Sequence, residues 1–264
     1  MYMYRQLKAE FYKLIHTYVF FLLPLLFLVS FFILTRTTNG VYILYSNWGE
    51  NSIGFFSFLQ SSGTSYTISD LTNTIISPSW GIWILVMLLT ISFFYKDYLL
   101  KTVNLSYTYG ASTTTIFFSK IITVILYFSI CYILFSIICC IYCVSFMSIK
   151  LNLTVILKVI KVLLLCYLIF ISFSVTCIFI TALTNSVLVS TTIISIGTLV
   201  SAYLLIVTWT PSSRTPFYFL LSPMYYLMSV AHRPIVSEII IYSLFNFILL
   251  IPCSIIILKK RIVS

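Results

Sequence analysis

The sequence predicts an all-α integral membrane protein that forms a single transmembrane domain over residues 1–264 and crosses the bilayer six times. Of the 264 residues, 61% are hydrophobic and 8% are charged, and the mean hydropathy is +1.12. A soluble domain of this length needs far more polar side chains to cover its surface. A helix that spans a bilayer needs roughly 20 mostly apolar residues. Six long apolar runs are present: Thr17–Thr35, Trp80–Tyr95, Ile121–Phe146, Val162–Leu183, Val187–Val207 and Ile239–Leu258.

The first run, Thr17–Thr35, follows a basic start to the chain. It is long for the core of a signal peptide, and no small-x-small cleavage site follows it in the sequence RTTNG. We therefore expect this run to stay attached as the first membrane span. The second run is the shortest, and we expect its helix to begin a turn earlier, around Ile75.

A polar segment, Tyr95–Lys120, separates the second run from the third. It carries three lysines, an aspartate and many hydroxyl groups. Its part KDYLLKTVNL has the spacing of a short amphipathic helix, in which Asp97 and Lys101 stand four positions apart in the favourable acid-before-base order. Gly110 then interrupts the pattern. We predict a short helix that lies flat under the membrane; the alternative is a connecting loop whose lysines reach toward the headgroups.

The fourth and fifth runs are separated only by Thr184–Ser186, which predicts a very tight turn. Small and hydroxyl side chains then recur in the fifth run at spacings of three, four and seven: Thr184, Thr191, Ser195, Thr198 and Ala202. Such faces let membrane helices approach closely and hydrogen-bond across the contact. We predict a pairing face for another membrane helix; the alternative is that the hydroxyls bond only to carbonyls of their own helix.

The stretch before the sixth run, WTPSSRTPFYFLLSPMYYLMSVAHRP, is too apolar for an ordinary loop. Its pieces PFYFLL and PMYYLMSV begin with proline, which favours the first turn of a helix. They predict short helices that re-enter the membrane or lie at its outer surface before the last span.

The formal net charge is +10, and the basic residues lie mostly at the ends of apolar runs. That placement indicates membrane topology and lipid headgroups, and no nucleic-acid-binding motif is visible. Because Lys and Arg favour the inner side of a membrane, the dense clusters at both chain ends predict cytoplasmic termini. The inner side then holds Arg5, Lys8, Lys13, Lys96, Lys101, Lys120, Lys259, Lys260 and Arg261. The outer side holds Arg36, Lys150, Lys158, Lys161, Arg214 and Arg233.

The middle of every run is free of Asp, Glu, Lys, Arg and His, which ion-coupled transporters carry within their spans. The chain has no GxxxxGK[ST] phosphate loop, no HExxH and no plausible Ser–His–Asp set. We therefore expect no enzyme activity and no bound cofactor or metal, and any uphill transport must draw energy from another subunit. The seven cysteines are expected to be small buried hydrophobic residues, with a metal or redox site at the CxxC of Cys140 and Cys143 as the lesser alternative.

Two stretches resemble type-2 ABC-transporter permeases. The opening LKAEFYKLIHTYVFFLLPLL is similar to the family's amphipathic elbow helix, in which an acidic residue and a following lysine precede a first span that often contains proline. The polar segment is similar to the family's loop between the second and third spans, which runs from an acidic residue through a threonine to a lysine at the third span. The matching residues are Glu10, Lys13, Pro24, Asp97, Thr102 and Lys120.

The resemblance implies a cytoplasmic coupling helix that contacts an ATP-binding subunit through Lys96, Asp97, Lys101 and Thr102. It implies a complex with a second permease, homologous or identical, and with two copies of an ATPase that uses ATP and Mg. The small size, short outer loops and N-terminal sequence look most like the permeases of lantibiotic-immunity and antimicrobial-peptide exporters. The implied function is ATP-driven expulsion of a membrane-active peptide from a bacterial cytoplasmic membrane, for self-immunity or resistance. The alternatives are a non-ABC scaffold or channel-like subunit, or an ABC permease for a lipid, polysaccharide or drug.

The outer segment SNWGENSIGFFSFLQ combines the aromatic residues Trp48, Phe55 and Phe56 with the carboxylate of Glu50. An amphipathic, cationic peptide dissolved in the outer leaflet would meet both aromatic rings and negative charge there. The alternative is that these rings anchor the protein at the membrane surface, as aromatic belts generally do.

Overall fold

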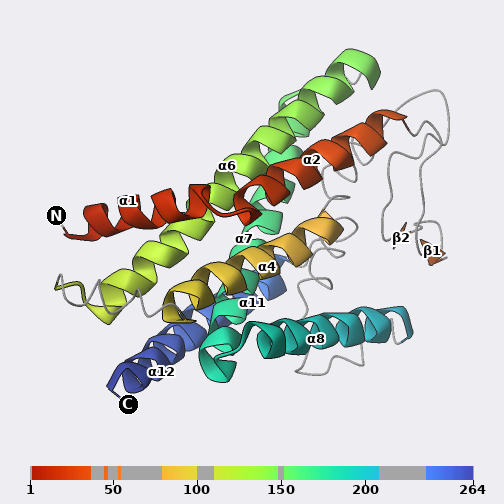
Figure 1. Ribbon diagram of the computed structural model, residues 1–264. Helices are drawn as coiled ribbons and strands as arrows, with labels where there is room; N and C mark the ends of the chain where they lie inside the picture. Colours follow the sequence, from red (N-terminus) through yellow and green to blue (C-terminus); the bar gives the residue numbers. More distant parts are fainter. Residues whose placement is uncertain are drawn as a thin grey trace.

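A computed structural model of the chain describes residues 2–36, 45–46, 53–54, 79–99, 110–147, 152–207 and 236–263. These residues form a bundle of helices and one short antiparallel strand pair (Figure 1). The helices are α1 (Tyr2–Ile15), α2 (Val19–Arg36), α4 (Ser79–Leu99), α6 (Thr113–Met147), α7 (Leu153–Thr184), α8 (Val187–Val207), α11 (Val236–Phe245) and α12 (Ile251–Val263), with a π-helical turn, η1 (Asn246–Leu250), joining the last two. The strands are β1 (Tyr45–Ser46) and β2 (Ile53–Gly54).

The six predicted apolar runs largely coincide with helical structure: the first begins two residues before α2, the fifth has the same bounds as α8, and the sixth spans α11, η1 and α12. Other helices extend beyond their runs. For example, α6 begins at Thr113 although the third run begins at Ile121, and α7 begins at Leu153 although the fourth begins at Val162. Apolar runs mark only the part of a helix that suits hydrocarbon, whereas backbone hydrogen bonding continues through polar turns at its ends. A hydropathy pattern therefore underestimates helix length.

The length and composition of these helices identify a membrane-embedded protein. Three described segments are long and apolar enough to cross a bilayer: Thr113–Ile138, Leu153–Thr184 and Val236–Lys260. A fourth span results if the bent pair α1–α2 is counted as one. The apolar parts described in α4 and α8, Trp83–Tyr95 and Val187–Val200, are shorter. The predicted total of six spans therefore stays a prediction.

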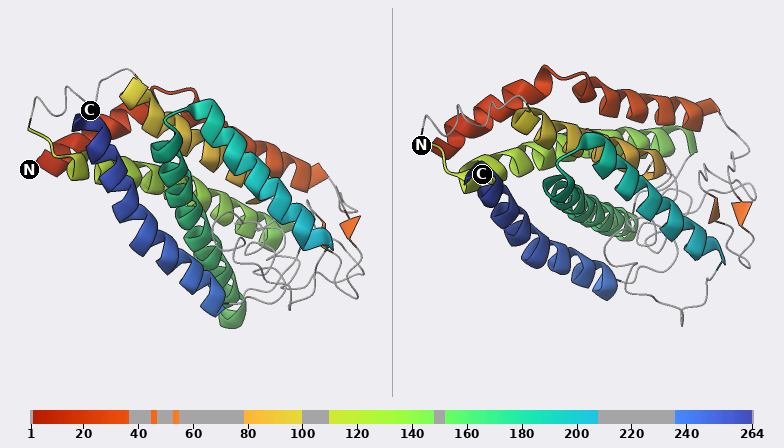
Figure 2. Two further views of the ribbon diagram at one scale, coloured as in Figure 1. Left: turned by 90° about the horizontal axis from the view of Figure 1, so that it is seen from below. Right: turned by 60° about the horizontal axis from the view of Figure 1, so that its bottom comes forward.

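Helix α7 is the centre of the bundle. In the right-hand view of Figure 2 it is surrounded by α4, α6, α8 and α12. Its middle turns are buried on nearly all sides, and Ile169, Phe170, Phe173 and Cys177 have no exposed surface. A helix that is apolar all round is expected at such a central position. Helices α4, α6, α8, α11 and α12 pack against α7, whereas α1 packs on α6 and α2 packs on α4 and α6.

The turn between α7 and α8 confirms the predicted tight connection. Helix α7 ends at Thr184, Asn185 adopts the left-handed conformation with φ 52°, and α8 begins at Val187. Asparagine tolerates this conformation because its short side chain adds little steric cost. The Asn185 N–H donates to the Thr181 carbonyl, and the hydroxyls of Thr184 and Ser190 lie 2.6 Å apart across the turn. The hairpin is thereby closed without a longer loop.

Proline within α2 is accommodated by a side chain from α6. Pro24 has no N–H, so the carbonyl of Phe20, four residues earlier, loses its helical donor. The hydroxyl of Tyr127 donates to that carbonyl, and the Phe20 and Tyr127 rings stack with centroids 4.9 Å apart. Because an unpaired carbonyl is costly in hydrocarbon, this bond holds α2 against α6.

The two chain termini lie at the same end of the bundle, as Figure 1 shows. The last turn of α4, the first turns of α6 and the end of α12 lie there as well. We call this the polar end, because Arg5, Lys8, Lys13, Lys259 and Lys260 are all found there. Helix α1 crosses it and meets α2 at an angle of 58°.

Candidate functional site

A buried carboxylate on α1 is the centre of a charged cluster at the polar end. Helix α1 has one face turned toward the bundle, on which Glu10 and Leu14 are fully buried. Glu10 Oε1 accepts hydrogen bonds from Gln6 Nε2 at 3.0 Å and from Lys13 Nζ at 3.1 Å. Both partners lie within one helical turn of Glu10, where side chains meet on the helix surface. The second carboxylate oxygen faces α6.

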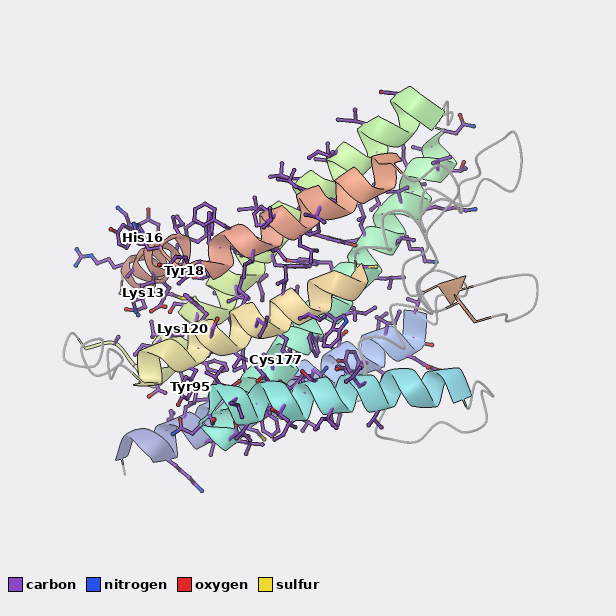
Figure 3. The ribbon with its side chains drawn as sticks, turned by 45° about the vertical axis from the view of Figure 1, so that its right-hand side comes forward. Lys13, His16, Tyr18, Tyr95, Lys120 and Cys177 are labelled. Atoms are coloured by element: carbon purple, nitrogen blue, oxygen red, sulfur yellow. The ribbon has the colours of Figure 1, made fainter. Side chains whose placement is uncertain are left out.

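That second oxygen binds a lysine from a distant part of the chain. Lys120 Nζ lies 2.9 Å from Glu10 Oε2, and each side chain is only 1% exposed. The same ammonium lies 3.5 Å from the Phe93 carbonyl of α4 and 4.5 Å from the centre of the Phe93 ring. Figure 3 shows Lys120 between α1 and α4, close to Lys13. The cluster therefore joins three helices.

The start of α6 fixes where Lys120 lies. Gly110 has φ +80°, a conformation that suits glycine, and the chain then enters the helix. Ser112 caps the helix, because its Oγ accepts the Thr115 N–H at 3.2 Å. Lys120 follows two turns later on the same buried face as Phe117. An apolar residue would ordinarily fill this position, and the lysine is accommodated because Glu10 faces it.

Energetically, this arrangement makes the contact between α1 and α6 specific. Removing two charges from water is costly, and their attraction offsets the cost only when the geometry and hydrogen bonding are good. Deleting one partner leaves an unpaired buried charge, which costs about 3–5 kcal/mol. Only a position of α1 that brings Glu10 to Lys120 avoids that cost. The pair therefore sets the orientation of α1 on the bundle.

Sequence reasoning identified Glu10 and Lys13 as site residues, and both lie in this cluster. It also matched Lys120 to the lysine at the third span, but did not pair it with Glu10. The sequence feature that could have indicated this pair is the small number of acidic residues: the chain has only five, and Lys120 lies directly before an apolar run. A charge in such a place requires a partner.

The residues assigned to the coupling helix are only partly described. Lys96 and Asp97 fall in the last turn of α4, which continues to Leu99. Lys101 and Thr102 lie outside the described residues, as do Trp48, Glu50, Phe55 and Phe56 of the predicted peptide-contacting segment and the predicted re-entrant stretch before the last span. Among the residues that are described, no three His, Cys, Asp or Glu side chains come together to hold a metal ion.

The predicted pairing stripe of the fifth run lies partly inside the chain. Thr184 is the last residue of α7 and therefore does not belong to the α8 stripe; in α8, Thr198 is fully buried, Thr191 and Ser195 are half-buried, and Ala202 lies near the end of the helix. Thr191 donates to the Val187 and Leu188 carbonyls, and Thr198 donates to those of Ile194 and Ser195. Ser195 Oγ lies 3.9 Å from Met87 Sδ of α4. These hydroxyls thus bond largely within this chain.

A second buried polar group lies deep in the bundle. Tyr242 of α11 is fully buried, and its hydroxyl lies beside Thr176 of α7 and beside Asn246. The Asn246 amide is buried beside the Tyr242 hydroxyl, and among the described residues neither its nitrogen nor its oxygen has a hydrogen bond of good geometry. Asn246 begins the π-helical turn that precedes Pro252. Sequence reasoning did not single out these residues, because one asparagine in an apolar run gives no periodic signal.

Comparison of the chain with protein-family models, with curated proteins and with solved structures finds no match.

Proposed function

We propose that this chain is the membrane-spanning subunit of an ATP-driven exporter. In this proposal it pairs with a second permease and binds two copies of a cytoplasmic ATPase at the polar end. The observation that carries the proposal is the buried Glu10–Lys120 ion pair, which fastens α1 to α6 beside the last turn of α4. The ATP-binding function belongs to the partner, because the chain lacks a phosphate-binding loop.

The ion pair supports this role for a mechanical reason. A soluble ATPase can move membrane helices only by displacing something stiff at the membrane surface. Lys120 contacts Glu10 of α1 and Phe93 of α4, so a push on this end moves α1, α4 and α6 together. Helix α2 follows, because Tyr127 holds it against α6. The segment proposed to receive the push joins α4 to α6.

For the substrate, we propose a lantibiotic or another membrane-active peptide, in a bacterial cytoplasmic membrane with both termini cytoplasmic. The support is the resemblance of the N-terminal sequence and the density of basic residues at both chain ends. Cells that carry the complete operon should tolerate such a peptide better than cells with this gene deleted. A deletion that alters export of a lipid, polysaccharide or drug, and sensitivity to no peptide, would leave only the permease assignment.

The assignment as a permease is tested by purification from the native membrane. We expect a tagged chain to retain an ATPase that contains a phosphate-binding loop, and we expect the complex to hydrolyse ATP. Lys120→Met should lower this hydrolysis several-fold per assembled complex, whereas Lys158→Met, at an exposed position of α7, should not. Absence of any ATPase from the purified complex would contradict the proposal and favour a scaffold or channel-like subunit.

A further inference from the structure

Helix α1 has a second face, opposite Glu10, that the proposed function does not use. Its side chains are exposed: Tyr4, Arg5, Lys8, Tyr12 and Ile15, with His16 of the following turn beside Tyr12. We call these residues the outer face of α1. Tyr4 is 74% exposed and Tyr12 is 65% exposed, although tyrosine is usually at least half-buried in a protein. An exposed face that alternates tyrosine with basic residues therefore requires an explanation.

The Glu10–Lys120 pair determines which way this face points. Because Glu10 faces α6, the opposite side of α1 faces away from the bundle. Figure 1 shows α1 at the edge of the bundle, following the same side as α2. Only three residues, His16–Tyr18, separate α1 from α2, so if α2 crosses the bilayer, as its sequence predicts, α1 lies at the level where α2 leaves the hydrocarbon. The outer face therefore borders the surrounding lipid at headgroup depth.

The chemistry of the outer face suits that depth. Tyrosine places an apolar ring at the edge of the hydrocarbon and its hydroxyl among the headgroups, and Tyr18, beside α1, is 93% exposed. Arg5 and Lys8 are one turn apart, and Lys259 and Lys260 are exposed at the same end. The Glu10 carboxylate faces inward to Lys13 and Lys120, so it does not neutralise Arg5 or Lys8.

We propose that the outer face of α1 binds the headgroups of anionic phospholipids. Arg5 and Lys8 contact the lipid phosphates, while Tyr4 and Tyr12 lie at the boundary between headgroups and acyl chains. A zwitterionic lipid carries a compensating ammonium and is bound less well. An acidic protein partner would also attract the two cations, but the position of α1 beside a membrane helix favours lipid. This site does not depend on the proposed ATPase.

The test measures lipid binding by the purified full-length chain in detergent, titrated with phosphatidylglycerol or phosphatidylcholine and read by native mass spectrometry. We expect a preference for phosphatidylglycerol that weakens as salt is added, because salt screens exposed charges. The double variant Arg5→Gln/Lys8→Gln should lower the apparent affinity for phosphatidylglycerol about tenfold. The matched control Lys158→Gln/Lys161→Gln removes two exposed charges from α7 and should change it less than about twofold.

Three results would overturn the proposal. The first is equal loss of affinity in both double variants, which would show a general effect of net charge. The second is a lipid preference that is insensitive to salt. The third is competition by free glycerol phosphate as effective as that by the lipid, which would indicate a site for a soluble anion. Both variants change exposed side chains, and an unaltered elution profile verifies that each one folds.

Discussion

The Lys120 ammonium lies 2.9 Å from the Glu10 carboxylate, although the two residues are 110 positions apart in the sequence. The contact joins the N-terminal helix to the segment that leads into α6, the two stretches on which the proposal of a permease rests. Neither residue is accessible to solvent, so the bond can be neither hydrated nor screened by salt as a surface ion pair is. It is a fixed joint between α1 and the bundle.

Replacing both partners of this ion pair should cost less stability than the sum of the two single replacements. Glu10→Gln or Lys120→Met alone leaves a buried charge and should cost about 3–5 kcal/mol, whereas the double change should cost clearly less than the sum of the two. Thermal unfolding of the purified chain in detergent measures both. Lys158→Met, at an exposed position, serves as the control and should be nearly neutral. Additive single effects would show that the two charges do not interact.

Pro24 and Tyr127 should be energetically coupled. Tyr127→Phe leaves the Phe20 carbonyl without a donor, at a cost of about 1–3 kcal/mol. Pro24→Ala supplies an N–H for the same carbonyl, so Tyr127→Phe should be much milder in that background. A double-mutant cycle on thermal stability measures the coupling. Tyr167→Phe, which removes a 2.6 Å contact with Ser129, should cost the same in both backgrounds.

If the proposed ATPase binds at the polar end, the segment between α4 and α6 should transmit its action. Replacing Asp97 and Lys101 with alanine should lower substrate-stimulated ATP hydrolysis by the assembled complex and leave membrane insertion unchanged, because the charged contacts would be lost. The reagent accessibility of a cysteine introduced at Lys101 tests the orientation independently. Labelling of that cysteine from outside intact cells, or full stimulation in the double variant, would contradict this role.

Ser195 gives the cleanest test of helix pairing by α8. It is half-buried beside Met87, whereas Thr198 and Ile194 are fully buried within the chain, so large residues at those two positions would disturb this protomer's own packing. Ser195→Phe should weaken association of two permeases more than Leu199→Phe, whose side chain is 62% exposed. Cross-linking yield in native membranes is the measurement. Equal cross-linking yields for Ser195→Phe and Leu199→Phe would show that the face of α8 that carries Ser195 has no role in pairing.

The buried amide of Asn246 should contribute nothing to stability. Because neither polar atom has a hydrogen bond of good geometry within the described part of the chain, Asn246→Leu removes a desolvation cost of about 1–3 kcal/mol and should leave thermal stability equal or higher. Ser243→Ala is the matched control, since its hydroxyl donates to the Ile239 carbonyl and its loss should be mildly destabilising. If Asn246→Leu instead destabilises the chain and Ser243→Ala does not, the amide has a structural partner. A stable but inactive Asn246→Leu variant would place Asn246 in transport.

The sequence predicted the helices better than the contacts between them. Five of the six apolar runs fell within helical segments and the first began only two residues before α2, because hydropathy reports the part of each helix that suits lipid. The Asn185 turn was also predictable, since only three polar residues separate two long runs. Glu10 and Lys120 could each be recognised as unusual, but their pairing depends on how α1 folds back onto α6, which no local pattern contains. The position of Thr198 likewise depends on which face of α8 meets α4.

The π-helical turn at Asn246–Leu250 has a consequence for the phase of the last helix. A regular α-helix advances roughly 100° per residue. Side chains spaced four residues apart are therefore each rotated about 40° from the one before, and a series of them gradually turns away from the bundle. Asn246, Leu250, Ser254 and Leu258 have that spacing and are nevertheless all buried, because the wider turn corrects the drift. A π-turn is equivalent to a one-residue insertion in an α-helix. Deleting one residue here should therefore convert the wide turn into a regular α-helical turn and leave Lys259 and Lys260 on the same side of the polar end.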